Sequence, residues 1–188
     1  MEERTWVAIV TLVCASASAP GAARADGRML EKGTMQVGGQ ISFTIERDAS
    51  IATTAGYTAH VAPGFGYFII DRLALRAGLG CDIPFGDLHQ NAPMSFFFDF
   101  GARYFIDAGH DLYPYLGFAI GPSFVLLDTG ETSTTLAFSV PVGLMYALNK
   151  YVALDFGTRV EYATVVSNGS GSTLTIPIGY LGIQAFFN

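Results

Sequence analysis

The segment from Tyr151 to Val166 alternates between apolar and polar residues with a period of two. Its first face comprises Val152, Leu154, Phe156, Thr158, Val160, Tyr162 and Val166. Its second face comprises Asp155, Gly157, Arg159, Glu161 and Ala163. This period predicts a β-strand, because successive side chains of a strand point to opposite faces. A lipid-compatible face opposite a charged face favours a transmembrane β-barrel over a soluble sandwich.

The same alternation recurs along the chain and predicts an all-β fold, an eight-stranded antiparallel up-and-down transmembrane β-barrel. The predicted strands are Thr34–Glu46, Thr54–Ile70, Leu73–Phe85, Met94–Ile106, Leu112–Leu127, Thr134–Leu148, Tyr151–Val166 and Thr173–Phe187. The last strand is expected to send Leu174, Ile176, Ile178 and Tyr180 outward. Phe186 and Phe187 are both apolar and blur this phase, for which a bulge is one explanation.

The connections between these strands alternate in length. Residues 71–72, 107–111 and 149–150 form short turns, whereas the other four links are longer and more polar. This is the arrangement of outer-membrane barrels, whose long loops lie outside the cell and whose termini lie in the periplasm. Four prolines interrupt the predicted strands and remove backbone donors, so they predict bulges or bends. They are Pro63, Pro122, Pro141 and Pro177.

Composition supports this class. Hydrophobic residues make up 51% of the chain, with 22 glycines, 15 phenylalanines and 9 tyrosines. After the first thirty residues, no apolar run reaches the roughly 18–20 residues that a helical span needs. A net charge of −6 and the lack of a basic cluster argue against a nucleic-acid partner.

The N-terminus has the features of a secretory signal peptide. Arg4 supplies the positive charge, Trp6 to Ala15 is apolar, and Ala23-Arg24-Ala25 is the preferred cleavage site. The predicted division is a signal peptide over 1–25, a short periplasmic lead-in over 26–32 and the barrel over 33–188. Cys14 leaves with the signal, so Cys81 stands alone on the lipid face and forms no intrachain disulfide.

In hydrocarbon, every backbone polar group must be paired, so strands cross a membrane only as a closed barrel. With eight strands, side chains just fill the interior. The inward positions therefore predict a polar network inside the barrel. Its members are Glu46, His60, Arg76, Asp82, Asp99, Arg103, Asp155, Arg159 and Glu161. Because buried charges persist only when paired or hydrogen-bonded, these groups are expected to neutralise one another or to hold water.

Aromatic residues gather near the short turns and predict an interfacial girdle on the periplasmic side. They are Tyr67, Phe68, Tyr104, Phe105, Tyr113, Tyr115, Tyr146, Tyr151, Phe186 and Phe187. The alternative is that some of them are ordinary strand-forming residues.

The strand opening YPYLGFAIG at Tyr113–Gly121 and the C-terminal strand GYLGIQAFFN resemble the OmpA/OmpX-like family of small bacterial outer-membrane barrels. The resemblance extends over about residues 33–188. It implies a Gram-negative outer membrane, with outer-membrane lipid and lipopolysaccharide as surroundings and the barrel-assembly machinery as a partner during biogenesis. In that family a final Phe helps the machinery to recognise the last strand, whereas here Asn188 follows Phe187.

The leading functional prediction is a monomeric, non-enzymatic, porin-like barrel with a structural or surface-interaction role and no cofactor or metal. One alternative is a narrow channel for small or apolar solutes. The other is a lipid A-modifying enzyme, for which the sequence offers few candidates: His60 inward, His89 beside Asp87 in a long link, and His110 in a short turn. The carboxylates of Asp87, Asp128 and Glu131 are interpreted as solvated rather than ion-binding. The spacing of Cys and His residues suggests no zinc site.

Overall fold

The computed structural model describes residues 28–47, 55–86, 94–126, 132–167, 171–176 and 179–188. Within these ranges, one short 3₁₀ helix, η1, spans Arg28–Leu30, and the rest of the regular structure is strand. The strands are β1 Met35–Arg47, β2 Ala55–Ile70, β3 Leu73–Gly86, β4 Ser95–Phe105, β5 Leu112–Leu126, β6 Thr132–Asn149, β7 Val152–Val165, β8 Ser172–Thr175 and β9 Tyr180–Phe187. In the described part of the chain, no helix is long and apolar enough to cross a membrane.

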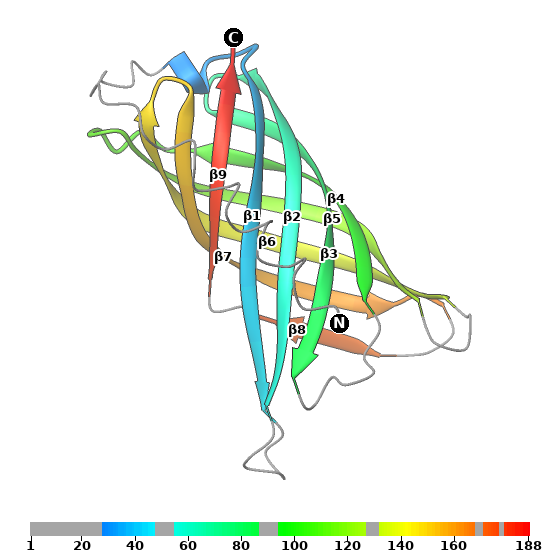
Figure 1. Cartoon of the computed structure of the whole chain (residues 1–188). Coiled ribbons are helices and arrows are strands. Elements are labelled where there is room, and N and C mark those ends of the chain that lie inside the picture. The colour runs from blue at the N-terminus through cyan, green and yellow to red at the C-terminus, as the bar shows by residue number, and fades with distance from the viewer. Residues whose placement is uncertain (1–27, 48–54, 87–93, 127–131, 168–170, 177–178) are drawn as a thin grey trace, which may run out of the picture.

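The strands form a closed antiparallel barrel (Figure 1). Each of β1 to β7 pairs with the next strand along the chain, and β9 pairs with both β7 and β1. The pairing of Met35 with Phe187 through Ser42 with Tyr180 closes the sheet. This confirms the predicted fold class, and the first seven predicted strands agree with β1 to β7 within two residues at each described end.

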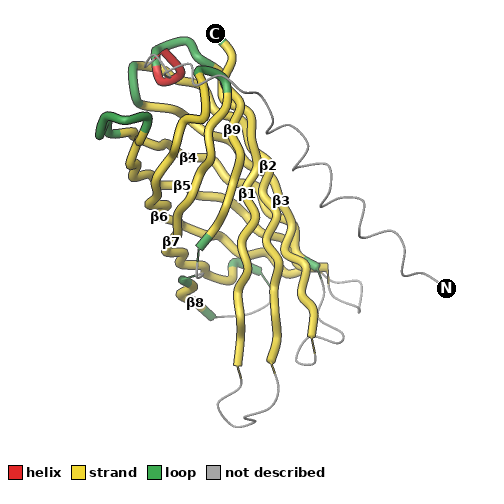
Figure 2. Tube along the Cα trace, turned by 60° about the vertical axis from the view of Figure 1, so that its left-hand side comes forward, coloured by secondary structure: helices red, strands yellow, loops and turns green. Residues whose placement is uncertain are grey.

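The short connections, helix η1 and the C-terminus lie at the same end of the barrel (Figure 2), which we call the short-turn end. The backbone ties these parts together there. The Arg72 amide donates to the Leu30 carbonyl at 2.7 Å, and the Phe186 amide donates to the Tyr151 carbonyl at 2.8 Å. The alternating lengths of the connections therefore correctly predicted that the short turns and the C-terminus lie at the same end of the barrel.

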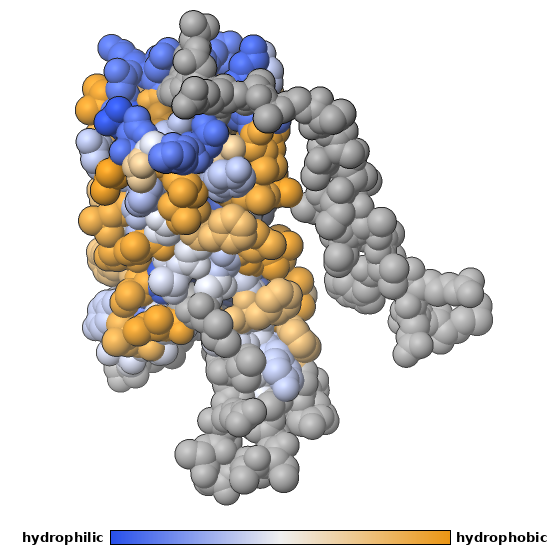
Figure 3. All heavy atoms as spheres, turned by 90° about the vertical axis from the view of Figure 1, so that its left-hand side faces the viewer, coloured by the Kyte–Doolittle hydropathy of each residue, from blue (hydrophilic) through white to orange (hydrophobic). Residues whose placement is uncertain are grey.

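The outer surface of the barrel is apolar. Large hydrophobic side chains from the predicted outward positions are exposed, including Leu79 at 57% and Phe118 at 60%. Figure 3 shows this apolar surface below a hydrophilic band at the short-turn end. In water, such an area of exposed Phe, Leu and Val would be strongly unfavourable, whereas lipid solvates it. Cys81 is free and half-exposed in the middle of this pattern on β3.

The predicted eighth strand is divided into β8 and β9. Both pair with β7, as Glu161 with Thr175 and Gly157 with Tyr180. These pairs are four residues apart on β7 but five apart on the opposite side. One additional residue therefore lies between Thr175 and Tyr180, which is the definition of a bulge, and the side-chain phase changes across it. Leu174 is exposed before the change, and Leu181 is exposed after it.

The prediction that Tyr180 points outward was therefore wrong. Tyr180 is buried, because the additional residue turns its side chain into the barrel. Of the predicted bulges or bends at prolines, the bulges were wrong for Pro63, Pro122 and Pro141, since the pairing of β1 to β7 keeps the same register on either side of each. That these prolines mark bends stays a prediction. Pro177 lies outside the described residues.

Candidate functional site

Eight of the nine residues predicted to form the polar network have described side chains, and these fall into two groups in the barrel interior. Arg76 and Arg103 line a small cavity of about 40 Å³ toward the short-turn end, and Asp155 contacts Arg103 beside it. His60, Asp82, Arg159 and Glu161 line a larger cavity of about 190 Å³ farther from that end. Asp99 and Arg159 border both cavities. The backbone of Glu46 lies in β1, but its side chain is outside the described residues.

Asp155 is the centre of the first group. Its side chain is 1% exposed and accepts hydrogen bonds from Arg103 Nη1 at 2.9 Å and Gln40 Nε2 at 2.8 Å. Gln184 Nε2 donates to the same carboxylate at 3.1 Å, and the Tyr115 hydroxyl donates to its other oxygen. Four donors from four different strands thus compensate one buried charge, as burial of an ionised carboxylate requires.

Two tyrosines extend this network across the interior. The hydroxyls of Tyr115 and Tyr180 are hydrogen-bonded to each other. The Arg103 guanidinium lies 4.7 Å from the Tyr115 ring centroid and 6.0 Å from that of Tyr180, so both rings provide cation–π contacts. Arg76 is close by, but its buried Nε has no hydrogen-bond partner in the part of the chain that the structure describes.

An aromatic cluster closes the barrel at the short-turn end, next to this network. Phe68 packs against Phe105 and Phe186 with centroid separations of 5.7 and 6.4 Å, and Phe105 packs against Tyr115 at 5.4 Å. The cluster also includes Met29 and Leu30 of helix η1, which are buried together with it. The side chains therefore form a hydrophobic plug across the mouth of the barrel.

This plug corrects the predicted interfacial girdle. Half of the aromatic residues assigned to the girdle point into the barrel and are buried, namely Phe68, Phe105, Tyr113, Tyr115 and Phe186. The other half are exposed on the outer surface, as predicted for a girdle, namely Tyr67, Tyr104, Tyr146, Tyr151 and Phe187. Neighbouring aromatic residues along a strand point to opposite faces, so a cluster in the sequence supplies both a girdle and a plug.

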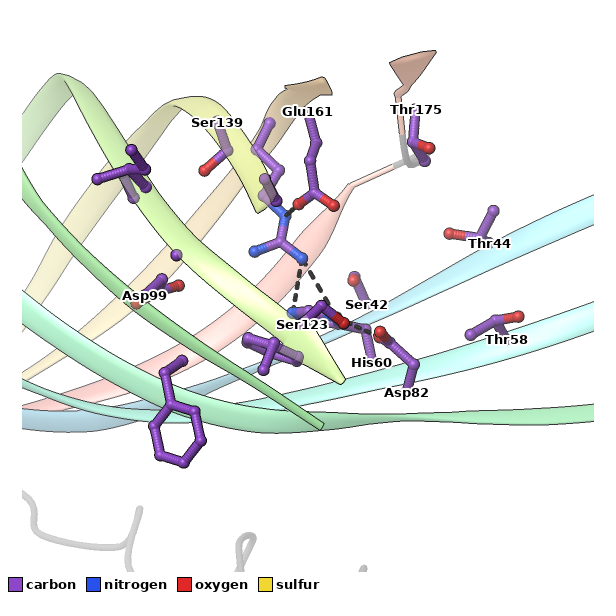
Figure 4. Close-up of a pocket in the computed structure, with 17 residues that line it drawn as sticks. Ser42, Thr44, Thr58, His60, Asp82, Asp99, Ser123, Ser139, Glu161 and Thr175 are labelled. Atoms are coloured by element: carbon purple, nitrogen blue, oxygen red, sulfur yellow. Dashed lines mark hydrogen bonds and ion pairs between the residues drawn. The ribbon is translucent and has the colours of Figure 1, made fainter. Parts of the chain in front are cut away.

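The second group is a chain of polar contacts across the larger cavity (Figure 4). His60 Nδ1 lies 2.5 Å from Asp82 Oδ1, and Ser95 Oγ donates to Asp82 Oδ2 at 2.8 Å. Arg159 Nη2 lies 2.7 Å from His60 Nε2, and its Nε lies 3.4 Å from Glu161 Oε2.

The contacts of His60 hold its ring in place. Arg159 Nη2 lies 3.2 Å from His60 Nδ1 as well as 2.7 Å from Nε2, so the guanidinium is close to both ring nitrogens. The ring is also held by stacking on Phe97, with centroids 4.5 Å apart. Asp82, Arg159 and Phe97 thus fix the position of the His60 ring.

Other candidate residues do not assemble into a site. Among the described residues, no cluster of His, Cys, Asp or Glu has a geometry that could hold a metal ion. His110 has a left-handed backbone, with a φ of 56°, and is exposed in the turn before β5. The predicted loop candidates Asp87, His89, Asp128 and Glu131 lie outside the described residues.

Sequence reasoning missed Gln40, Tyr115, Tyr180 and Gln184 as members of the network. The signal for Tyr115 was present, since alternation along Leu112–Leu127 puts apolar Leu116 and Phe118 on one face and Tyr115 on the other. The role of Tyr180 depends on the bulge before β9, which the period of two did not locate.

Comparison with known proteins identifies the fold. No sequence-family profile and no curated protein sequence matches this chain. Neisserial surface protein A (NspA) matches with a TM-score of 0.57 and 20% identity, over 82% of this chain and 96% of that structure. The N-terminal β-barrel domain of Pseudomonas aeruginosa OprF matches with a TM-score of 0.52 and 13% identity, over 83% of this chain and 98% of that domain. The predicted resemblance is therefore confirmed as a likeness of fold to small eight-stranded outer-membrane barrels.

Proposed function

We propose that this chain is a non-enzymatic protein of the bacterial outer membrane, with a structural or surface-interaction role, whose interior is closed to solute flow. The single observation that carries the closed interior is the plug. Phe68, Phe105 and Phe186 are each at most 1% exposed, so they fill the barrel at its short-turn end. Next to them in the interior, the buried network holds Arg103 and Asp155 in place. Only a cavity of about 40 Å³ remains at this level of the barrel.

The outer surface supports the membrane location. Apolar side chains cover the strands, and exposed Tyr and Phe residues flank the short turns, where an interfacial girdle is expected. We propose export by the signal peptide and cleavage after Ala25, assembly by the barrel-assembly machinery, and a monomer surrounded by lipid and lipopolysaccharide. N-terminal sequencing of protein recovered from an outer-membrane fraction tests this, with Asp26 as the expected first residue.

Single-channel recording in planar bilayers tests the closed interior. The folded wild-type barrel is expected to give no discrete conductance steps. A variant with both Phe68→Ala and Phe105→Ala removes two rings from the plug and serves as the comparison. Discrete, reproducible steps from the wild-type protein would support the narrow channel and contradict the proposed role.

Lipid A analysis tests the absence of enzyme activity. Mass spectra of lipid A from cells with and without the protein are expected to be identical. His60 supports this expectation, because Asp82, Arg159 and the Phe97 ring occupy its accessible sides. A mass change that depends on His60 would instead identify a lipid A-modifying enzyme.

A further inference from the structure

Among the described residues of the barrel interior, two charged side chains have no direct partner. The interior arginines Arg103 and Arg159 each have a carboxylate oxygen within 3.4 Å. In contrast, the side chains of Arg76 and Asp99 form no ion pair or hydrogen bond with any residue that the structure describes. A buried charge is strongly unfavourable unless polar groups surround it, so both side chains require compensation.

Arg76 and Asp99 lie close together, over two neighbouring glycines. Gly64 on β2 pairs directly with Gly78 on β3. A Cβ on Gly64 would lie 3.2 Å from Arg76 Nη2, and a Cβ on Gly78 would overlap Asp99 Oδ1. Because directly opposed Cβ positions are about 4.5–5.5 Å apart, the guanidinium and the carboxylate occupy adjacent places in the wall. They attract each other electrostatically across a short gap that neither side chain closes.

This gap belongs to the smaller cavity of the barrel. Gly64, Arg76, Gly78 and Asp99 all line that cavity, whose volume is about 40 Å³. A cavity needs about 10–15 Å³ to hold one water molecule, so about two or three waters fit. The facing charges of Arg76 and Asp99 sum to zero, which favours a neutral ligand over an ion. Water also has the required chemistry, because it accepts from a guanidinium, which only donates, and donates to a carboxylate, which only accepts.

We propose that the smaller cavity binds ordered water, which accepts hydrogen bonds from the Arg76 guanidinium and donates hydrogen bonds to the Asp99 carboxylate. The buried Nε of Arg76 has no partner among the described residues, so the guanidinium has a donor to spare. A bridge through water is nearly as favourable in enthalpy as a direct hydrogen bond. It therefore compensates both charges although their side chains do not meet.

The bound water connects the two polar groups of the interior. Asp155, the centre of the first group, also attracts Arg76 electrostatically. Asp99 lines both cavities, so the water bridge ends at the wall of the cavity that contains His60 and Arg159. The barrel interior is then one continuous polar network that includes water. This inference goes beyond the proposed function and does not depend on it, since the hydration of the isolated barrel is measured.

A crystal structure of the detergent-folded mature protein, at a resolution that shows ordered water, tests the proposal directly. We expect continuous water density from the Arg76 guanidinium to the Asp99 carboxylate. Three results would overturn the proposal: a direct ion pair between these side chains, a cavity without density, or an ion in place of water. Crystals grown with sodium bromide distinguish the last case, because bound bromide gives an anomalous signal and water does not.

Nuclear magnetic resonance of protein labelled with ¹⁵N-arginine provides a second measurement in solution. The Nε–H signal of Arg76, assigned by its loss in Arg76→Lys, is expected to show a cross-peak with water. Ala62→Leu fills the smaller cavity, which Ala62 lines, and is expected to abolish this cross-peak. Ala59→Leu is the matched control, because Ala59 pairs with Phe43 on the lipid face of the same strand, and it is expected to keep the cross-peak. Heat-modifiable gel migration establishes folding. A wild-type protein without the cross-peak, or a folded Ala62→Leu variant that retains it, would contradict the proposed site.

Discussion

Substitution of Asp155 by Asn is expected to destabilise the barrel strongly. Asn keeps the shape of the side chain but removes the negative charge, and the Arg103 guanidinium, 6% exposed, then has no counter-ion at its 2.9 Å contact. Removal of one partner from a buried ion pair costs about 3–5 kcal/mol, because the remaining charge stays desolvated. The amide also cannot accept all four donors of Gln40, Arg103, Tyr115 and Gln184.

Reversible urea unfolding in thin-bilayer vesicles measures this loss. Circular dichroism in the strand region reports folding, since the only tryptophan, Trp6, lies in the predicted signal peptide. Asp107→Asn is the matched control, because Asp107 forms a 3.3 Å pair with Arg72 in which both side chains are nearly half exposed. Such exposed pairs contribute about 0–1 kcal/mol.

The comparison between Asp155→Asn and Asp107→Asn tests whether the buried network stabilises the barrel. If Asp155→Asn lowers the free energy of unfolding by no more than Asp107→Asn, the buried network does not stabilise the barrel. The double variant Arg103→Leu/Asp155→Leu is expected to be more stable than Asp155→Asn alone, because it removes the Arg103 charge together with its counter-ion. A double variant less stable than the single one would contradict the assignment of the loss to an uncompensated Arg103.

Three further predictions concern the packing and the orientation of side chains. Gly121→Val is expected to abolish the heat-modifiable folded species, because a Cβ there overlaps a carbonyl oxygen of β4, whereas Gly171→Val meets nothing within 4 Å and is expected to fold normally. Phe105→Ala in the plug is expected to cost about 3–5 kcal/mol in urea unfolding, and Phe100→Ala on the outer surface much less; equal losses would contradict the plug. A bimane label on Cys81 is expected to be quenched by brominated lipid, and an unquenched label would contradict the outward orientation of this side chain.

The strands from β1 to β7 were predictable because their physical cause is local. Each sends alternate residues toward lipid and toward the interior, so a period of two is visible without knowledge of any partner strand. The identity of the inward charged residues followed from the same phase. Which of them contact each other did not, because pairing depends on the stagger of strands around the barrel. Arg103 and Asp155 come from β4 and β7, which are not adjacent in the sheet.

The plug was harder to predict, because the aromatic residues near the short turns belong to two different structures. Some form the girdle on the outer surface, and the others form the plug in the interior. A residue such as Phe68 and its neighbour Tyr67 both look like girdle residues, yet they point to opposite faces. Helix η1 adds Met29 and Leu30 from a segment predicted to be a polar lead-in. These contacts join residues that are far apart in the sequence, so no local pattern indicates them.

The bulge between β8 and β9 connects these observations. Without the additional residue, the phase of Leu174 would continue and place Tyr180 on the lipid face. With it, Tyr180 faces inward and its hydroxyl meets that of Tyr115, which in turn donates to Asp155. The same change of phase places Gln184 and Phe186 inside, where one joins the network and the other joins the plug. An irregularity in the closing strand is therefore what allows the last strand to fill the barrel interior, because regular alternation would have directed these three side chains into lipid.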